Sequence, residues 1–123
     1  MKEMNKLITN NKFLFEKVKA GELIEGSALD VLLRVRDFVH LGSKILTHPL
    51  CGNLRPNHQP FRSIIIEEKN SPLDLESLTL IEHAVEVYKS CKVISPEELD
   101  ELTRQDYAYI DSELMSESVK LYF

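Results

Sequence analysis

The chain has 123 residues, 43% of them hydrophobic and 28% charged, and its formal net charge is −5. This length suffices for one hydrophobic core but not for two, so we predict a single domain over residues 1–123. No apolar run approaches the roughly 20 residues that cross a bilayer, and no basic stripe interleaved with aromatic residues is present, which argues against membrane insertion and against nucleic acid as a partner.

The first third of the chain alternates short apolar runs with helical patterns. The residue types predict a strand, a helix and a second strand, in this order: 6–9, 12–20 and 22–25. Ser27 is a good helix N-cap and Asp30 completes an approximate capping box, which together predict a long helix that ends at Gly42. Apolar residues at helical spacing form its buried stripe: Ala28, Val31, Leu32, Val35, Phe38 and Val39.

Two more predicted strands, 44–47 and 63–66, flank a long loop. The second contains three consecutive isoleucines, a run typical of a strand that is covered on both faces. Neighbouring strands are usually joined by roughly two to six residues, so the loop over residues 47–60 is unusually long. We therefore expect this loop to have a role beyond connecting two strands.

The remainder of the chain predicts two helices. Apolar residues at helical spacing over residues 75–91 predict a helix of about five turns. Ser95 to Glu98 combine a capping box with proline at the first helical position, which predicts the start of another helix, with a break near Asp106. The acidic residues of this part, Asp111 among them, are expected on a solvated helix surface. The predicted apolar face of this last helix comprises Leu99, Leu102, Tyr107, Ile110 and Leu114.

Strands that alternate with helices indicate an α/β fold, which we predict to be a small three-layer, Rossmann-like domain with a mainly parallel sheet of about four strands and C-terminal helices. Residues 1–70 would form a strand-rich part with the site loop, and residues 71–123 an acidic helical part. In open parallel sheets, ligands bind beyond the carboxyl ends of the strands. Three segments should therefore meet at one edge: 9–11, 26–27 and 47–60.

At this edge the sequence favours a small anionic ligand. No acidic residue occurs from 38 to 66, whereas Lys44, Arg55, Arg62 and three histidines do, and a local field of that sign attracts anions. The helix beginning at Ser27 would direct backbone N–H groups toward the edge, and Arg55 could grip a carboxylate or phosphate. Chance spacing of acids and an ordinary capped helix remain alternative interpretations. The predicted ligand-binding residues are Asn10, Asn11, Gly26, Ser27, His48, Asn53, Arg55 and Asn57.

Two other chemistries fit the residue types of the loop. His48, Cys51 and His58 are potential zinc ligands, but their spacing matches no closed zinc pattern, so we predict no metal site. Cys51 could act as a nucleophile if His48 or a helix N-terminus lowered the pKa of its thiol. The simpler interpretation is a small residue before the Gly52-Asn53 turn. Catalytic residues and any cofactor stay unassigned from sequence.

Three groups of residues carry a family resemblance: Leu7 to Asn11, Val31 to His40, and Leu46 to Leu50 together with 55–57 and 60–63. They resemble the GrdX family of small proteins, which are encoded beside the glycine reductase genes of anaerobic, amino-acid-fermenting bacteria. The resemblance spans most of residues 7–66 and is weaker in the acidic C-terminal part. It implies an accessory role beside the selenium-dependent reductases for glycine, sarcosine or betaine, and a family in which a small residue can replace Cys51.

Three functions are consistent with these observations. The leading one is a non-catalytic accessory protein that binds a small anion at the strand edge. The second is a small enzyme that acts on a carbonyl or phosphoryl substrate through His48 and Cys51. The third is a partner-docking protein whose acidic helices contact a reductase subunit. Because no signal peptide is present and both cysteines are expected to be free thiols, we expect a cytoplasmic protein.

Overall fold

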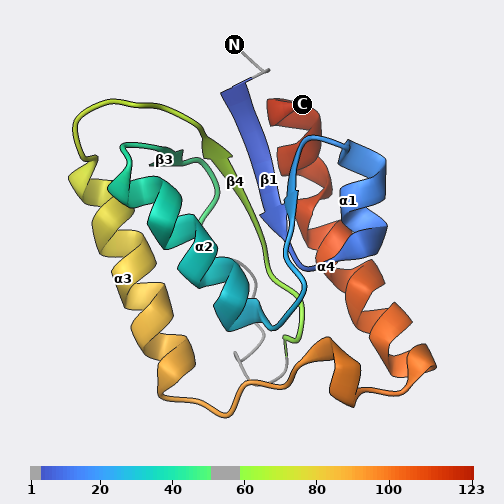
Figure 1. Ribbon diagram of the computed structural model, residues 1–123. Helices are drawn as coiled ribbons and strands as arrows, with labels where there is room; N and C mark the ends of the chain where they lie inside the picture. Colours follow the sequence, from blue (N-terminus) through green and yellow to red (C-terminus); the bar gives the residue numbers. More distant parts are fainter. Residues whose placement is uncertain (1–3, 51–58) are drawn as a thin grey trace.

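The computed structural model describes residues 4–50 and 59–123, and at its centre is a four-stranded sheet with helices on both faces (Figure 1). The strands are β1 (Asn5–Thr9), β2 (Gly21–Leu23), β3 (Lys44–Ile45) and β4 (Ser63–Glu67). The helices are α1 (Lys12–Val18), α2 (Ala28–His40), α3 (Leu75–Lys89) and α4 (Glu101–Tyr122), with a short 3₁₀ turn, η3 (Pro96–Glu98), before α4. Among the described residues, no helix is both long and apolar enough to cross a membrane.

The prediction of a mainly parallel, Rossmann-like sheet is wrong. The strand order is β2-β1-β4-β3, and only β1 and β2 pair in parallel, while β4 is antiparallel to both of its neighbours. Parallel neighbours need a crossover connection, usually a helix, and the described residues between β3 and β4, 46–50 and 59–62, contain no helix. Because β4 is the reversed strand, β1, β2 and β3 still point the same way. Their carboxyl ends therefore share one edge, where β4 begins.

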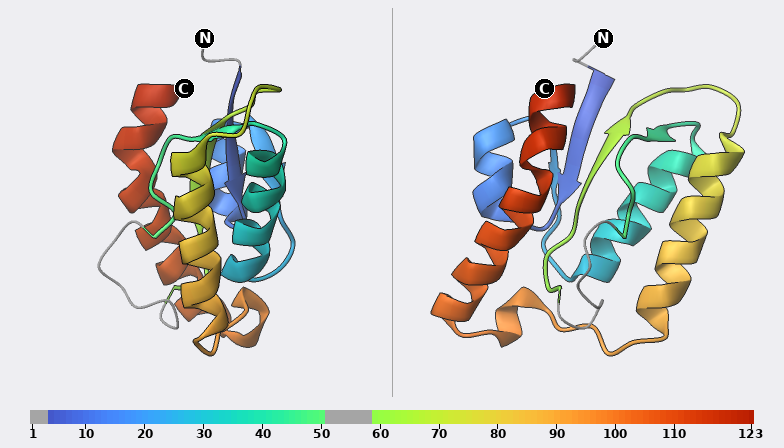
Figure 2. Two further views of the ribbon diagram at one scale, coloured as in Figure 1. Left: turned by 90° about the vertical axis from the view of Figure 1, so that its left-hand side faces the viewer. Right: turned by 180° about the vertical axis from the view of Figure 1, so that it is seen from behind.

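The alternation of side chains along β4 divides the core into two layers. Ile64 and Ile66 pack with residues of α2 and α3, whereas Ile65 packs with Leu14 of α1 and Met115 of α4. All three isoleucines have no exposed surface, which confirms the prediction of a strand covered on both faces. Fully burying one such side chain contributes roughly 1.5–3 kcal/mol, so this strand is a main source of stability. Figure 2 shows α2 and α3 on one face of the sheet and α1 and α4 on the other.

Helix α2 forms as its sequence predicts. The side chain of Ser27 caps its first turn, and the six residues of the predicted apolar stripe are all buried. Helix α3 packs against α2 and ends at Lys89, two residues before the predicted end. Local caps and helical periodicity thus suffice to predict both helices.

Helix α4 differs from its prediction in three ways. Pro96 begins only a 3₁₀ turn, because Leu99 is extended, and the α-helix starts at Glu101 and continues through the predicted break at Asp106. The helix buries Ser112 and Met115. The predicted apolar face is largely exposed instead, with exposed fractions for Leu102, Ile110 and Leu114 of 73%, 41% and 46%.

Candidate functional site

At the shared edge, the side chain of Asn10, which directly follows β1, connects the segments that precede α2 and β4. Its amide nitrogen donates hydrogen bonds to the backbone oxygens of Gly26 (3.0 Å) and Pro60 (2.9 Å), and its Oδ1 accepts one from the backbone nitrogen of Arg62 (2.9 Å). Of the three segments predicted to converge here, 9–11 and 26–27 do meet, and they are joined by Pro60, the last residue of the third. Asn10 donates both amide protons to acceptors within the chain, so its side chain fixes the positions of these segments relative to one another.

Asn11 joins the same edge to α4. Its Oδ1 accepts a hydrogen bond from the backbone of Leu14 and caps α1, and its amide nitrogen donates to the backbone oxygen of Ala108 (2.9 Å) and to Asp111 Oδ2 (3.0 Å). This side chain is fully buried. Like Asn10, it has both amide protons engaged within the chain, so it orients α4 against the sheet.

A chain of hydrogen bonds runs from the end of β1 to α4. The backbone nitrogen of Asn11 donates to Thr9 Oγ1 (2.9 Å), Thr9 Oγ1 lies 2.7 Å from Ser63 Oγ, and Ser63 donates to Asp111 Oδ2 (2.6 Å). Because a hydroxyl has one proton and Ser63 gives its own to Asp111, Thr9 is the donor to Ser63. We call Thr9, Asn10, Asn11, Arg62, Ser63 and Asp111 the edge cluster.

Asp111 is the member of the edge cluster that sequence reasoning misplaced. It was expected on a solvated surface, yet it faces Asn11 and Ser63. Burial raises the pKa of its carboxyl, and the hydrogen bonds from Ser63 and Asn11, together with the charge of Arg62, oppose that rise. The available signal was its position four residues before Met115, which places it beside the buried face of α4.

Arg62 lies at the other end of the edge cluster and is only 3% exposed. Its Nε and Nη2 donate to the hydroxyl of Tyr88 at 3.2 and 2.7 Å, and Nη2 also donates to Gln59 Oε1. It therefore connects the start of β4 to α3. Arg62 contributed to the predicted positive field, and the structure shows that this charge is buried beneath the edge.

The start of α2 is occupied by its own capping groups. The backbone nitrogen of Ser27 donates to Asp30 Oδ2 (2.8 Å), and the backbone nitrogen of Asp30 donates to Ser27 Oγ (3.3 Å). A Cβ added at Gly26 would lie 2.3 Å from Asp30 Oδ2, so glycine leaves room for this carboxylate. Gly26 and Ser27 are thus explained by the capping of α2.

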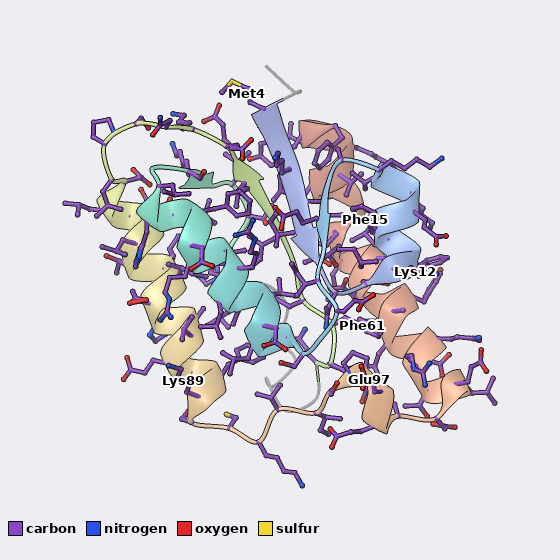
Figure 3. The ribbon with its side chains drawn as sticks, in the orientation of Figure 1. Met4, Lys12, Phe15, Phe61, Lys89 and Glu97 are labelled. Carbon is purple, nitrogen blue, oxygen red and sulfur yellow. The ribbon has the colours of Figure 1, made fainter. Side chains whose placement is uncertain are left out.

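A groove of about 230 Å³ lies beside the edge cluster. Its charged lining residues are Lys12, Glu25 and Glu97. The Nζ of Lys12 also lies 3.8 Å from Oε1 of Glu16. Figure 3 shows Lys12 and Glu97 toward the end of the molecule to which β1 points, away from Met4. The full lining comprises Asn10, Lys12, Leu23, Ile24, Glu25, Gly26, Pro96 and Glu97.

Of the predicted loop residues, His48 is the one within the described ranges. It is exposed, and its Nδ1 accepts a hydrogen bond from the backbone nitrogen of Leu50 (3.0 Å). Asn53, Arg55, Asn57, Cys51 and His58 lie outside the described residues. Within residues 4–50 and 59–123, no three side chains of the metal-binding types are placed to hold an ion.

The model of the GrdX-like protein family matches residues 6–120, which is nearly the whole chain. The chain belongs to the GrdX-like family. The match includes the acidic C-terminal part, so all members of the edge cluster, Asp111 included, lie inside the GrdX-like region. Comparison with curated proteins and with solved structures gives no match.

Proposed function

We propose that this GrdX-like chain is a non-catalytic accessory protein that binds a small anionic ligand at the carboxyl edge of β1 and β2 and works beside the glycine, sarcosine or betaine reductases. The association with these reductases is the one that the family resemblance implies. The observation that supports a site is the set of three hydrogen bonds of Asn10, which join the end of β1, the start of α2 and the return of the 47–60 loop. Arg55, from the interval without acidic residues, would supply positive charge.

The charges of the groove narrow the class of ligand. Lys12 would attract a carboxylate, whereas Glu25 and Glu97 line the same groove and would repel a multiply charged anion. A ligand that carries a carboxylate next to a positively charged group can pair with Lys12 through the first and with the two glutamates through the second. Ligand pockets usually measure about 300–1,000 Å³, and this groove of about 230 Å³ is smaller. We therefore propose an amino-acid-sized zwitterion in preference to a nucleotide.

Thermal-shift measurements with inorganic phosphate, nucleotides, glycine, sarcosine and betaine test the proposal. At 100 times its Kd, a ligand that binds only the folded state adds about 2.7 kcal/mol to the free energy of unfolding. We expect stabilisation by the zwitterions, reduced in Lys12→Ala and in Arg55→Ala. Lys92→Ala, which removes an exposed lysine outside this groove, is the matched control. No stabilisation by glycine, sarcosine or betaine, or equal stabilisation in all three variants, would refute the proposal.

A further inference from the structure

A second groove, of about 480 Å³, lies between α1 and α4 and has exposed aromatic walls. Its lining residues are Phe13 from α1 and Gln105, Asp106, Ala108 and Tyr109 from α4. Phe13 is 45% exposed and Tyr109 is 57% exposed. Figure 1 shows α1 and α4 adjacent on the same face of the sheet, and Figure 2 shows the same pair from behind. Two large aromatic side chains therefore border a groove that is open to solvent.

Other exposed apolar side chains lie along the outer side of α4, and two of them, Ile110 and Leu114, also border a small hollow beside Phe61 on the other flank of the helix. Leu102, Ile110 and Leu114 belong to the face that the sequence predicts to be buried, yet all three are exposed. In a helix, residues three and four positions apart share a face, so Leu102 and Tyr109, seven positions apart, lie close to one line. An apolar helix face left in solvent is a common mark of an interaction surface.

The charges on the same face indicate what kind of partner fits. Asp106 lines the groove, and Glu113 and Glu117, which share its side of the helix, are exposed. Residues 71–123 carry twelve acidic and four basic residues, so the surrounding field is negative. On the α1 side, Lys17 already places its ammonium group 4.1 Å from the centre of the Phe13 ring. The ring and the carboxylate that face a partner's cation are therefore Tyr109 and Asp106 on the α4 side, a combination that attracts cationic side chains.

We propose that the groove between α1 and α4 is a docking surface for a basic, amphipathic segment of a partner protein. A lysine or arginine of that segment stacks on Tyr109 and pairs with Asp106, and its apolar residues cover Leu102 and Ile110. This inference does not depend on the proposed anion site, because the two grooves share no lining residue.

The test measures the Kd of a fluorescent peptide for the full chain. The peptide has 14 residues in alternating lysine and leucine patches and folds as an amphipathic helix. A peptide of the same charge with serine in place of leucine, and one with glutamate in place of lysine, are the peptide controls. Tyr109→Ser and Asp106→Asn should each weaken binding about two- to five-fold, the range expected for one exposed cation–π or ion pair. Leu75→Ser and Glu86→Gln make the same kinds of change at exposed positions on α3 and should leave Kd unchanged.

Melting temperatures of all four variants confirm that they fold, since each changes an exposed side chain. Chemical-shift changes on titration should be concentrated at residues 102–117 and at Phe13. Three results would overturn the proposal: equal affinity of the serine and leucine peptides, equal effects of Tyr109→Ser and Leu75→Ser, or no binding. Sedimentation that reveals a dimer lost in Tyr109→Ser would also overturn it, because a second copy of the chain would then occupy the groove.

Discussion

Replacing Asn10 by alanine removes three hydrogen bonds from a side chain that is 8% exposed. The backbone oxygens of Gly26 and Pro60 and the backbone nitrogen of Arg62 would each lose a partner. A typical buried hydrogen bond contributes about 0.5–1.5 kcal/mol net, so we expect Asn10→Ala to lower the free energy of unfolding by about 2–4 kcal/mol. For a domain of this size that corresponds to a fall in Tm of about 8–15 °C.

Asn10→Asp gives a sharper test of the same geometry. An aspartate keeps the acceptor for the backbone nitrogen of Arg62, but it places a carboxylate against the two carbonyl oxygens of Gly26 and Pro60. Because neither oxygen can donate a hydrogen bond, this variant should be less stable than Asn10→Ala at pH 7. The two carbonyl oxygens would raise the pKa of this carboxyl, and its protonated form regains one donor, so the deficit should shrink as the pH falls from neutral toward about 4.

Urea unfolding at pH 7 and at pH 3.5, followed by circular dichroism, measures both effects. Asn5→Ala is the matched control, because Asn5 makes a single half-buried bond, to the backbone oxygen of Tyr122 (3.1 Å). It should cost about 1 kcal/mol or less. The reasoning fails if Asn10→Ala costs no more than Asn5→Ala, or if Asn10→Asp is as stable as Asn10→Ala at neutral pH.

Three further changes test other parts of the fold. The pKa of Asp111 is raised, so the free energy of unfolding of the wild type should fall as the pH rises from about 4 to that raised pKa. Asp111→Asn should abolish this fall, and parallel pH profiles of the free energy of unfolding for the wild type and the variant would contradict the prediction. The pKa of Glu22 is lowered by its hydrogen bonds from Arg34, so Glu22→Gln should cost less than about 1 kcal/mol at pH 7, and this cost should shrink as the pH falls through the lowered pKa, which pH-dependent thermal melts measure. Gly42 has φ of 104°, and an added Cβ would lie 2.1 Å from the backbone oxygen of Ser71, so Gly42→Ala should cost about 1–3 kcal/mol in urea unfolding; an unchanged midpoint would contradict it.

The structure changes the meaning of the predicted ligand donors. Asn10 and Asn11 were expected to offer amide protons to an anion, but both side chains donate those protons to acceptors within the chain. In the proposed site, Lys12 is the described residue that would attract the negative group of a ligand, and the asparagines would fix the frame beside it. This division of roles is why the Lys12→Ala and Arg55→Ala variants decide the proposal.

Some features of the fold follow from sequence alone because their causes act over a few residues. The capping box of Ser27 and Asp30 predicts the start of α2, and the three isoleucines of β4 predict burial on both faces. The convergence of residues 9–11, 26–27 and the end of the 47–60 loop also follows, because the carboxyl ends of β1 and β2 share one edge. Each of these depends on spacing that can be read within one element or between neighbouring elements.

Other features depend on contacts between residues far apart in the chain. The direction of β4 is decided by its pairing with β1, in which Thr9 lies opposite Ser63. The face that α4 buries is decided by the hydrogen bond between Asn11 and Asp111, one hundred residues apart, and by Met115 in the core, against the apolar pattern of Leu102 and its neighbours. Local periodicity measures how apolar a face is but not which partner is available to cover it. The sequence by itself therefore determined the elements and the meeting of their ends, and only the tertiary structure decided the sheet direction, the buried carboxyl and the exposed face of α4.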